Sequence, residues 1–254
     1  KNLETSKRRF EAFFTNYRRH LNAGNTVAAA AQEAKEDGDL AEAVRLFELM
    51  GRYYTNNTYY AGSLVQLSQC YTKLGERQKS LAAMKRYVAI EPNPVRRDQA
   101  QMSLAQMYKD EGFDIMAGAE TNETEEAVAK QLKQGSAQII RGIKQFKDFA
   151  ARSDKALADP SVPAGEKKQY QKLKEGAIFL IGDSWGRMQK PPEKIEGFRK
   201  NAIASLEDYV KQFPKGQYAR MAYVRLATMY TALNDVEKAK EIAEIFDQFI
   251  KSLL

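Results

Sequence analysis

The chain repeats itself at a fixed interval. Gly38, Gly75 and Gly112 follow one another 37 residues apart, and similar residues recur at the same distances on both sides of each glycine. The recurring residues around Gly75 are Leu64, Leu67, Ser68, Tyr71, Ser80, Met84, Tyr87 and Pro92. A period of roughly 20–50 residues is typical of a stack of similar units, each of which buries its apolar face on its neighbours. The period therefore predicts a repeat architecture.

Within each repeat, the spacing of apolar residues predicts two helices. These residues lie three or four apart, which places them on one stripe of a helix. Glycine, or Asn234 in a further copy near the C-terminus, suits the left-handed residue that ends the first helix. A small residue lets the second helix approach closely, an aromatic residue three positions later fills the gap, and Pro92 or Pro214 ends the second helix. The small residues are Ala31, Ser68, Ala105 and Ala227. The predicted unit is a helix–turn–helix, and the predicted fold class is all-α.

The composition agrees with this class and excludes several kinds of site. Only 15 Gly and 7 Pro occur in 254 residues, too few for an all-β fold with many tight turns. Cys70 is the only cysteine and His20 the only histidine, so neither an intrachain disulfide nor a Cys- or His-based metal site is expected. No phosphate-binding loop, dinucleotide motif or zinc-protease motif occurs. We therefore expect no cofactor and no metal.

Residues 181–186, IGDSWG, match the G-x-S-x-G pattern of serine hydrolases. Such a site needs a strand before the serine, a helix after it and a histidine later in the chain. No histidine follows Ser184. The repeat explains the stretch better, because Gly182 then takes the small position and Trp185 the aromatic position of a further unit, with its second helix over 202–214. We therefore expect no catalytic residues and no enzymatic activity.

The net charge of +7 leaves one alternative function open. It arises from 40 Lys and Arg against 33 Asp and Glu. The interleaving of the two signs favours an ordinary solvated surface, whereas the excess of positive charge is compatible with an RNA-binding helical repeat. RNA binding would require a basic face and a strong dependence on salt.

The recurring pattern resembles the tetratricopeptide repeat family, whose unit is a helix–turn–helix with the same small, aromatic, turn and proline positions. Residues 61–94 match best, and 198–214 and 220–250 match well, so the resemblance covers about two-thirds of the chain. The first unit has Ala34 where an aromatic residue is usual, and the third has Gln101 where an apolar residue is usual. The resemblance implies a right-handed superhelix of stacked repeats, with an inserted long helical pair in the middle.

Four segments are expected along the chain. Residues 1–23 form an N-terminal helix, 24–118 hold three repeat units, 119–175 are an inserted or elongated helical pair, and 176–254 hold the C-terminal units. The N-terminal helix would cap the array or complete a unit. Its basic and aromatic residues also allow docking on a membrane or a partner.

The middle segment departs from the repeat. Thr121-Asn122 is expected to cap a long helix that ends by about Leu157. A Pro-containing turn follows, and a second helix is expected from near Ala164 to Met188.

The resemblance also implies a binding face. Repeats of this family bind extended peptides or partner helices in a concave groove that is lined by fixed positions of the first helices. These positions fall on Asn25, Gln32, Lys35, Gln69, Thr72, Gln99, Gln106 and Lys109. Three of them, Gln32, Gln69 and Gln106, would form a column at intervals of 37 residues.

The style of the repeats suggests a subclass. Ala28, Val65 and Met102 stand where members that clamp the acidic tail of heat-shock chaperones would carry a lysine, which argues against such an adaptor. The run Tyr-Val-Lys-Gln-Phe-Pro-Lys-Gly at 209–216 resembles bacterial envelope members, such as outer-membrane assembly lipoproteins, pilotins and repeat regions attached to secretins of pili or secretion systems. The resemblance implies a scaffold in the periplasm or at the outer membrane, with a cytoplasmic location as the alternative. Because the chain starts at Lys1 rather than Met, any membrane anchor is expected in parts outside this sequence.

Overall fold

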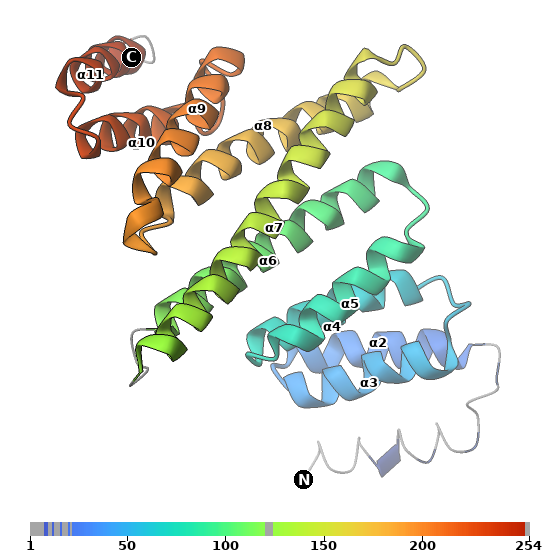
Figure 1. Ribbon diagram of the computed structural model, residues 1–254. Helices are drawn as coiled ribbons and strands as arrows, with labels where there is room; N and C mark the ends of the chain where they lie inside the picture. The colour runs from blue at the N-terminus through green and yellow to red at the C-terminus, as the bar shows by residue number, and fades with distance from the viewer. Residues whose placement is uncertain are drawn as a thin grey trace. The chain divides into compact units, whose positions relative to one another are not determined.

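The computed structural model describes residues 8, 9, 12, 16, 20, 22–119 and 124–251 (Figure 1). Every regular element in these ranges is a helix, which confirms the all-α prediction, and none of these helices is long and apolar enough to cross a membrane. The chain divides into two compact parts, residues 1–97 and 98–254. The helix expected over 1–23 falls almost wholly outside the described residues and stays a prediction.

The first part holds two regular helical hairpins, and its helices are α2 (Ala23–Glu36), α3 (Leu40–Tyr53), α4 (Tyr60–Lys73) and α5 (Arg77–Ile90). Gly38 and Gly75 form the turns with φ of 82° and 77°, the left-handed region that glycine adopts without strain. At the second turn, the Glu76 amide donates to the Tyr71 carbonyl oxygen at 2.8 Å and so satisfies the end of α4. Both turns lie where the 37-residue interval predicted them.

The two helices of the second hairpin touch at the predicted small residues. The Ser80 hydroxyl donates to the Ser68 carbonyl oxygen at 2.7 Å, and the two hydroxyl oxygens lie 2.9 Å apart. The exposed Thr72 lies next to this buried pair, with its hydroxyl 2.8 Å from that of Ser80. Side chains larger than serine would hold the helices further apart, so the small position works as the pattern predicted.

The second part is built from longer helices: α6 (Pro94–Gly118), which begins just before it, α7 (Glu125–Ala158), α8 (Ala164–Arg187), α9 (Ile195–Gln212), α10 (Ala219–Ala232) and α11 (Val236–Lys251), with a short 3-10 helix, η2 (Pro192–Lys194), before α9. Figure 1 shows α7 running back along α6 and α8 running back along α7. The two long helices expected on either side of the Pro-containing turn are thus present. The expected cap was wrong, because the Thr124 side chain caps α7 by accepting from the Ala127 amide; Thr121 and Asn122 lie outside the described residues.

Gly112 is not a turn, contrary to the sequence prediction. It lies inside α6, which continues to Gly118. A β-carbon at Gly112 would lie 2.5 Å from the Gly135 carbonyl oxygen of α7, and one at Gly142 would lie 2.7 Å from the Ala105 carbonyl oxygen of α6. These glycines let α6 and α7 pack backbone against backbone, so the second helix of this pair is α7 itself.

The IGDSWG stretch forms the last turns of α8, as the repeat interpretation predicted. Gly182 faces α9, where an added β-carbon would lie 2.6 Å from Cγ of Leu206. Ser184 is fully buried and its hydroxyl donates to the Leu180 carbonyl oxygen of the same helix. Trp185 stacks on Phe198 with a centroid distance of 5.7 Å. Ser184 therefore does not sit on a strand-to-helix elbow. The second helix, expected over 202–214, begins seven residues earlier than predicted, at Ile195.

One hydrogen bond recurs between successive hairpins. The Tyr71 hydroxyl of α4 donates to Glu48 of α3, and the Tyr230 hydroxyl of α10 donates to Glu207 of α9. Both pairs are 23 residues apart and join the first helix of one hairpin to the second helix of the hairpin before it. Each bond satisfies the polar end of an otherwise buried tyrosine and fixes the register of the two hairpins.

Candidate functional site

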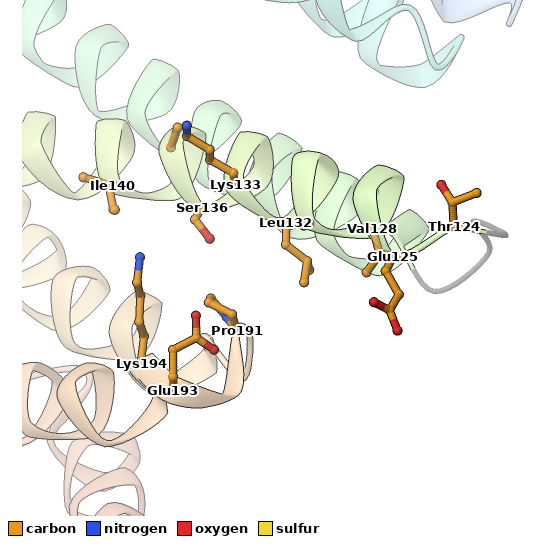
Figure 2. Close-up of a pocket in the computed structure, with 12 residues that line it drawn as sticks. Thr124, Glu125, Val128, Leu132, Lys133, Ser136, Ile140, Pro191, Glu193 and Lys194 are labelled. Carbon is orange, nitrogen blue, oxygen red and sulfur yellow. The ribbon is translucent and has the colours of Figure 1, made fainter.

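A cavity lies along the N-terminal half of α7 (Figure 2). Helix α7 has 34 residues and α8 has 24, a difference of about 15 Å in length at 1.5 Å per residue. Because α8 packs antiparallel to α7 from the turn at 159–163, it ends before it reaches the first turns of α7. The connection from α8 to α9 closes the cavity on its other side. We call this cavity the α7 cleft.

The α7 cleft is mainly apolar and has a volume of about 800 Å³. Its apolar wall includes Val128, Leu132 and Ile140 from α7 and Pro191 from the connection. Ile140 is 45% exposed, whereas its neighbour Ile139 is fully buried in the α6–α7 interface. A ligand that covers an exposed isoleucine beside a cavity binds more favourably, because apolar surface is removed from water.

Charged side chains of both signs surround this wall. Figure 2 shows Lys133 and Glu125 on α7 and Lys194 and Glu193 on the opposite side. Among the described residues that line the cleft there is neither cysteine nor histidine. An apolar floor with a rim of mixed charge is suited to binding a short peptide segment that presents apolar side chains and polar flanks.

The first helices of the first part form a second candidate surface, the face that the sequence predicted to bind a partner. Lys35 of α2 reaches across to α4, where its ammonium donates to Oε1 of Gln69 at 2.7 Å and also to Gln66. Asn25 accepts from the Asn57 side-chain amide at 2.8 Å. Gln66 was not among the predicted residues. We call this surface the α2–α4 face.

The other two predicted residues of the first part are oriented differently. The Gln32 amide donates to Glu36 Oε1 at 2.6 Å, within α2. The Thr72 hydroxyl donates to the Ser68 carbonyl oxygen of its own helix at 3.0 Å. Neither side chain joins the Lys35 bridge among the contacts of the described residues.

The predicted residues of α6 belong to the second part. Gln99 is exposed and Gln106 is half-buried. Lys109 is only 7% exposed, and its ammonium forms an ion pair with Asp110 at 3.2 Å. Its β-carbon lies against Gly142, so burial of the stem comes from the close approach of α7.

Comparison with known proteins agrees with these hairpins. The tetratricopeptide repeat model matches residues 61–94, which span α4, its turn and α5. These residues resemble a tetratricopeptide repeat. Comparison with curated protein sequences gives no match.

Solved structures extend the likeness beyond that segment. The nearly identical TPR-like repeats of a Podosopora anserina kinesin light chain protein superpose with a TM-score of 0.52 at 16% identity, covering 90% of this chain and 95% of that one. A variant of the same protein gives the same TM-score and identity, covering 89% and 93%. The assembly chaperone of RpL4, Acl4, gives a TM-score of 0.44 at 13% identity, covering 91% and 76%. The first two likenesses show that the fold is that of a TPR-like helical repeat.

Proposed function

We propose that the chain is a non-enzymatic scaffold that binds a segment of a partner protein, and that the α7 cleft is the principal binding site. The observation that carries this proposal is the exposed Ile140 beside an apolar cavity of about 800 Å³. TPR-like repeats present helical surfaces to protein partners, which supports the same function. The α2–α4 face, with Lys35, Gln69 and Asn25, is the alternative surface for such a segment.

Site-specific photocrosslinking in cells tests the proposal. A benzoylphenylalanine placed at Ile140 should crosslink one protein, which mass spectrometry identifies, whereas the probe at exposed Lys168 of α8 should not. With that partner purified, Ile140→Lys should weaken binding at least tenfold, because it places a charge on the apolar wall. Ile90→Lys is the matched control, since Ile90 is 42% exposed and lies at the end of α5.

The same purified partner separates the two surfaces. Gln69→Arg places a second positive charge beside Lys35 and should break the bridge across α2 and α4. A loss of binding with Gln69→Arg but not with Ile140→Lys would move the site to the α2–α4 face. Unchanged binding in both variants would contradict the proposal at both surfaces. RNA binding, the alternative that the net charge of +7 allows, would appear as a salt-sensitive mobility shift with RNA alone.

We further propose that the scaffold works in a bacterial envelope assembly, such as a pilus or secretion secretin or an outer-membrane assembly system. The support is the style of the sequence at 209–216, which comes before a Tyr- and Ala-rich helix. Cell fractionation followed by immunoblotting should find the protein in the periplasmic or outer-membrane fraction. Recovery in the cytosol alone would contradict this location.

A further inference from the structure

The hairpin of α10 and α11 exposes positions that an earlier hairpin buries. In the α2–α3 hairpin, Phe47 and Met50 follow the turn residue Gly38 by nine and twelve positions and are 3% and 0% exposed. In the α10–α11 hairpin, Ala243 and Phe246 follow the turn residue Asn234 by the same distances. Ala243 is exposed and Phe246 is half-buried.

The α8–α9 hairpin gives the same comparison independently. Leu206 and Tyr209 lie four and seven residues after the small residue Ala202, and Ala243 and Phe246 lie four and seven after Ala239. Leu206 and Tyr209 are both fully buried. In each earlier case the cover is the first helix of the next hairpin, α4 in the first part and α10 in the second.

A cavity of about 550 Å³ occupies the corresponding place on α10 and α11. Its lining includes Val224, Ala227, Thr228, Thr231, Ala243 and Phe246. Val224 is 49% exposed. We call this cavity the α10–α11 socket. Small and apolar side chains line it because these positions are the ones on which a further helix packs in the earlier hairpins.

A carboxylate marks the same site. Glu48 and Glu207, which accept from the tyrosines of the covering helices, lie five residues after the small residues Ala43 and Ala202. Glu244 lies five residues after Ala239 and so takes the same position on α11. It is exposed, and within 124–251 and the other described residues no hydrogen bond or ion pair engages it.

We propose that the α10–α11 socket binds an amphipathic helix of a partner protein, and that a tyrosine of this helix donates its hydroxyl to Glu244. The covering helices define the chemistry of the occupant. Both α4 and α10 carry a small residue three positions before the tyrosine, Ser68 before Tyr71 and Ala227 before Tyr230. A second copy of the chain is disfavoured, because α2 carries Ala34 at the tyrosine position and has no hydroxyl to offer Glu244.

A synthetic peptide tests the socket with the full chain. The probe is a fluorescein-labelled peptide of residues 58–76, which contains α4 and its tyrosine, and fluorescence anisotropy measures its binding. The peptide should bind, and Glu244→Ala in the chain or Tyr71→Phe in the peptide should each weaken it about tenfold, as expected for a hydrogen bond to a charged group. The two changes together should weaken it no further than either alone, because they remove the same bond. Glu241→Ala is the matched control, since Glu241 lies one turn earlier on α11 and pairs with Lys238 at 3.2 Å.

Two further variants keep the result interpretable. Ala243→Glu should block peptide binding by filling the socket. Ile140→Lys in the α7 cleft should leave peptide binding unchanged. A negative result for the socket is therefore distinct from a negative result for the α7 cleft of the proposed function. Absence of peptide binding, or binding that ignores both Glu244→Ala and Ala243→Glu, would overturn the proposal. Self-association of the chain that Ala243→Glu abolishes in analytical ultracentrifugation would also overturn it, because the occupant would then be a second copy.

Discussion

Gly75 and Gly112 occupy equivalent places in the 37-residue period, yet they serve opposite purposes. Gly75 has a φ of 77° and open space where a β-carbon would stand. Gly112 is helical and has the backbone of α7 within 2.5 Å of that position. In the first case glycine is needed for its backbone freedom, and in the second for the absence of a side chain. The contrast separates the regular hairpins of residues 23–90 from the long helices that follow, and substitutions in both regions test it.

Gly112→Ala should have the largest effect among the alanine substitutions. The added methyl group collides with the Gly135 carbonyl oxygen and with Ile139, so α6 and α7 must move apart and lose packing over their whole contact. We expect the free energy of unfolding to fall by about 3 kcal/mol, at the upper end of overpacking costs. Denaturation by guanidinium measures this loss, and hydrogen exchange should show faster opening of α6 and α7 amides.

Gly62→Ala is the control for this substitution. Gly62 lies inside α4, where an added β-carbon meets no atom. Alanine should therefore raise the free energy of unfolding by up to about 1 kcal/mol through helix propensity alone. If Gly112→Ala were as harmless as Gly62→Ala, the result would contradict the close backbone packing of α6 on α7.

Glu91→Gln tests the corner that ends the regular region. The carboxylate of Glu91 is 6% exposed and accepts from the Tyr87 hydroxyl at 2.7 Å and the Asn93 amide at 3.0 Å. The Tyr87 bond, together with the Asn93 amide and Arg96, holds the pKa of this carboxyl below its ordinary value of 4.5. Loss of these charge-assisted bonds should lower the free energy of unfolding by about 2 kcal/mol at neutral pH.

The pH dependence of this effect has a defined sign. Because the folded-state pKa of Glu91 is lowered, the stabilisation is present above pH 4.5 and is lost as pH falls through the folded-state pKa. The difference between wild type and Glu91→Gln should therefore shrink below pH 4.5 in denaturation curves. A difference that grows toward low pH would show that Glu91 is not held as a carboxylate.

Gly75→Ala should have a smaller effect of a different kind. Alanine has room at this position but is strained at a φ of 77°, so we expect a loss of about 1 kcal/mol. Gly75→Asn should recover part of this loss, since Asn tolerates the left-handed region and Asn234 adopts it with a φ of 59°. At Gly112 the same asparagine should be worse than alanine. Equal responses to asparagine at the two glycines would remove the distinction between them.

Ser184→Ala should have the smallest effect. The hydroxyl only donates to the carbonyl oxygen of Leu180 in its own helix. That oxygen keeps its backbone hydrogen bond when the hydroxyl is removed. We expect a change of about 0.5 kcal/mol or less by thermal denaturation. Gly182→Leu in the same stretch should disrupt the α8–α9 contact, because Leu206 lies against it. A large loss on removing the Ser184 hydroxyl would indicate a role beyond this bond.

The sequence predicted the elements better than their contacts. The turns at Gly38, Gly75 and Asn234 and the long helices on either side of the Pro-containing turn were visible in spacing and turn chemistry alone. The role of Gly112 depends on Gly135, a partner from another helix that no local pattern identifies. The choice of Thr124 as the cap of α7 was equally hidden, since Thr121 and Asn122 are as good capping residues by type.

The two candidate binding surfaces also differ in how far the sequence predicts them. The α2–α4 face follows from repeat positions, and its groove residues stay a prediction. The α7 cleft follows from the unequal lengths of α7 and α8, and the exposed Ile140 could not be told from its buried neighbour without their pairing. The assignment of residues 119–175 as an insertion also stays a prediction.

The tyrosines that join successive hairpins give the protein a built-in optical signal. Burial, followed by the hydrogen bond to the partner glutamate, raises the pKa of both Tyr71 and Tyr230 far above the ordinary value of 10.0. In the folded protein these phenols stay neutral in alkali that ionises exposed ones, and tyrosinate absorbs ultraviolet light at longer wavelengths than neutral tyrosine does. Above pH 10 these tyrosines lose their protons more readily in the unfolded chain than in the folded one, so alkali destabilises the contact between successive hairpins. The rise in tyrosinate absorbance then reports the separation of the hairpins.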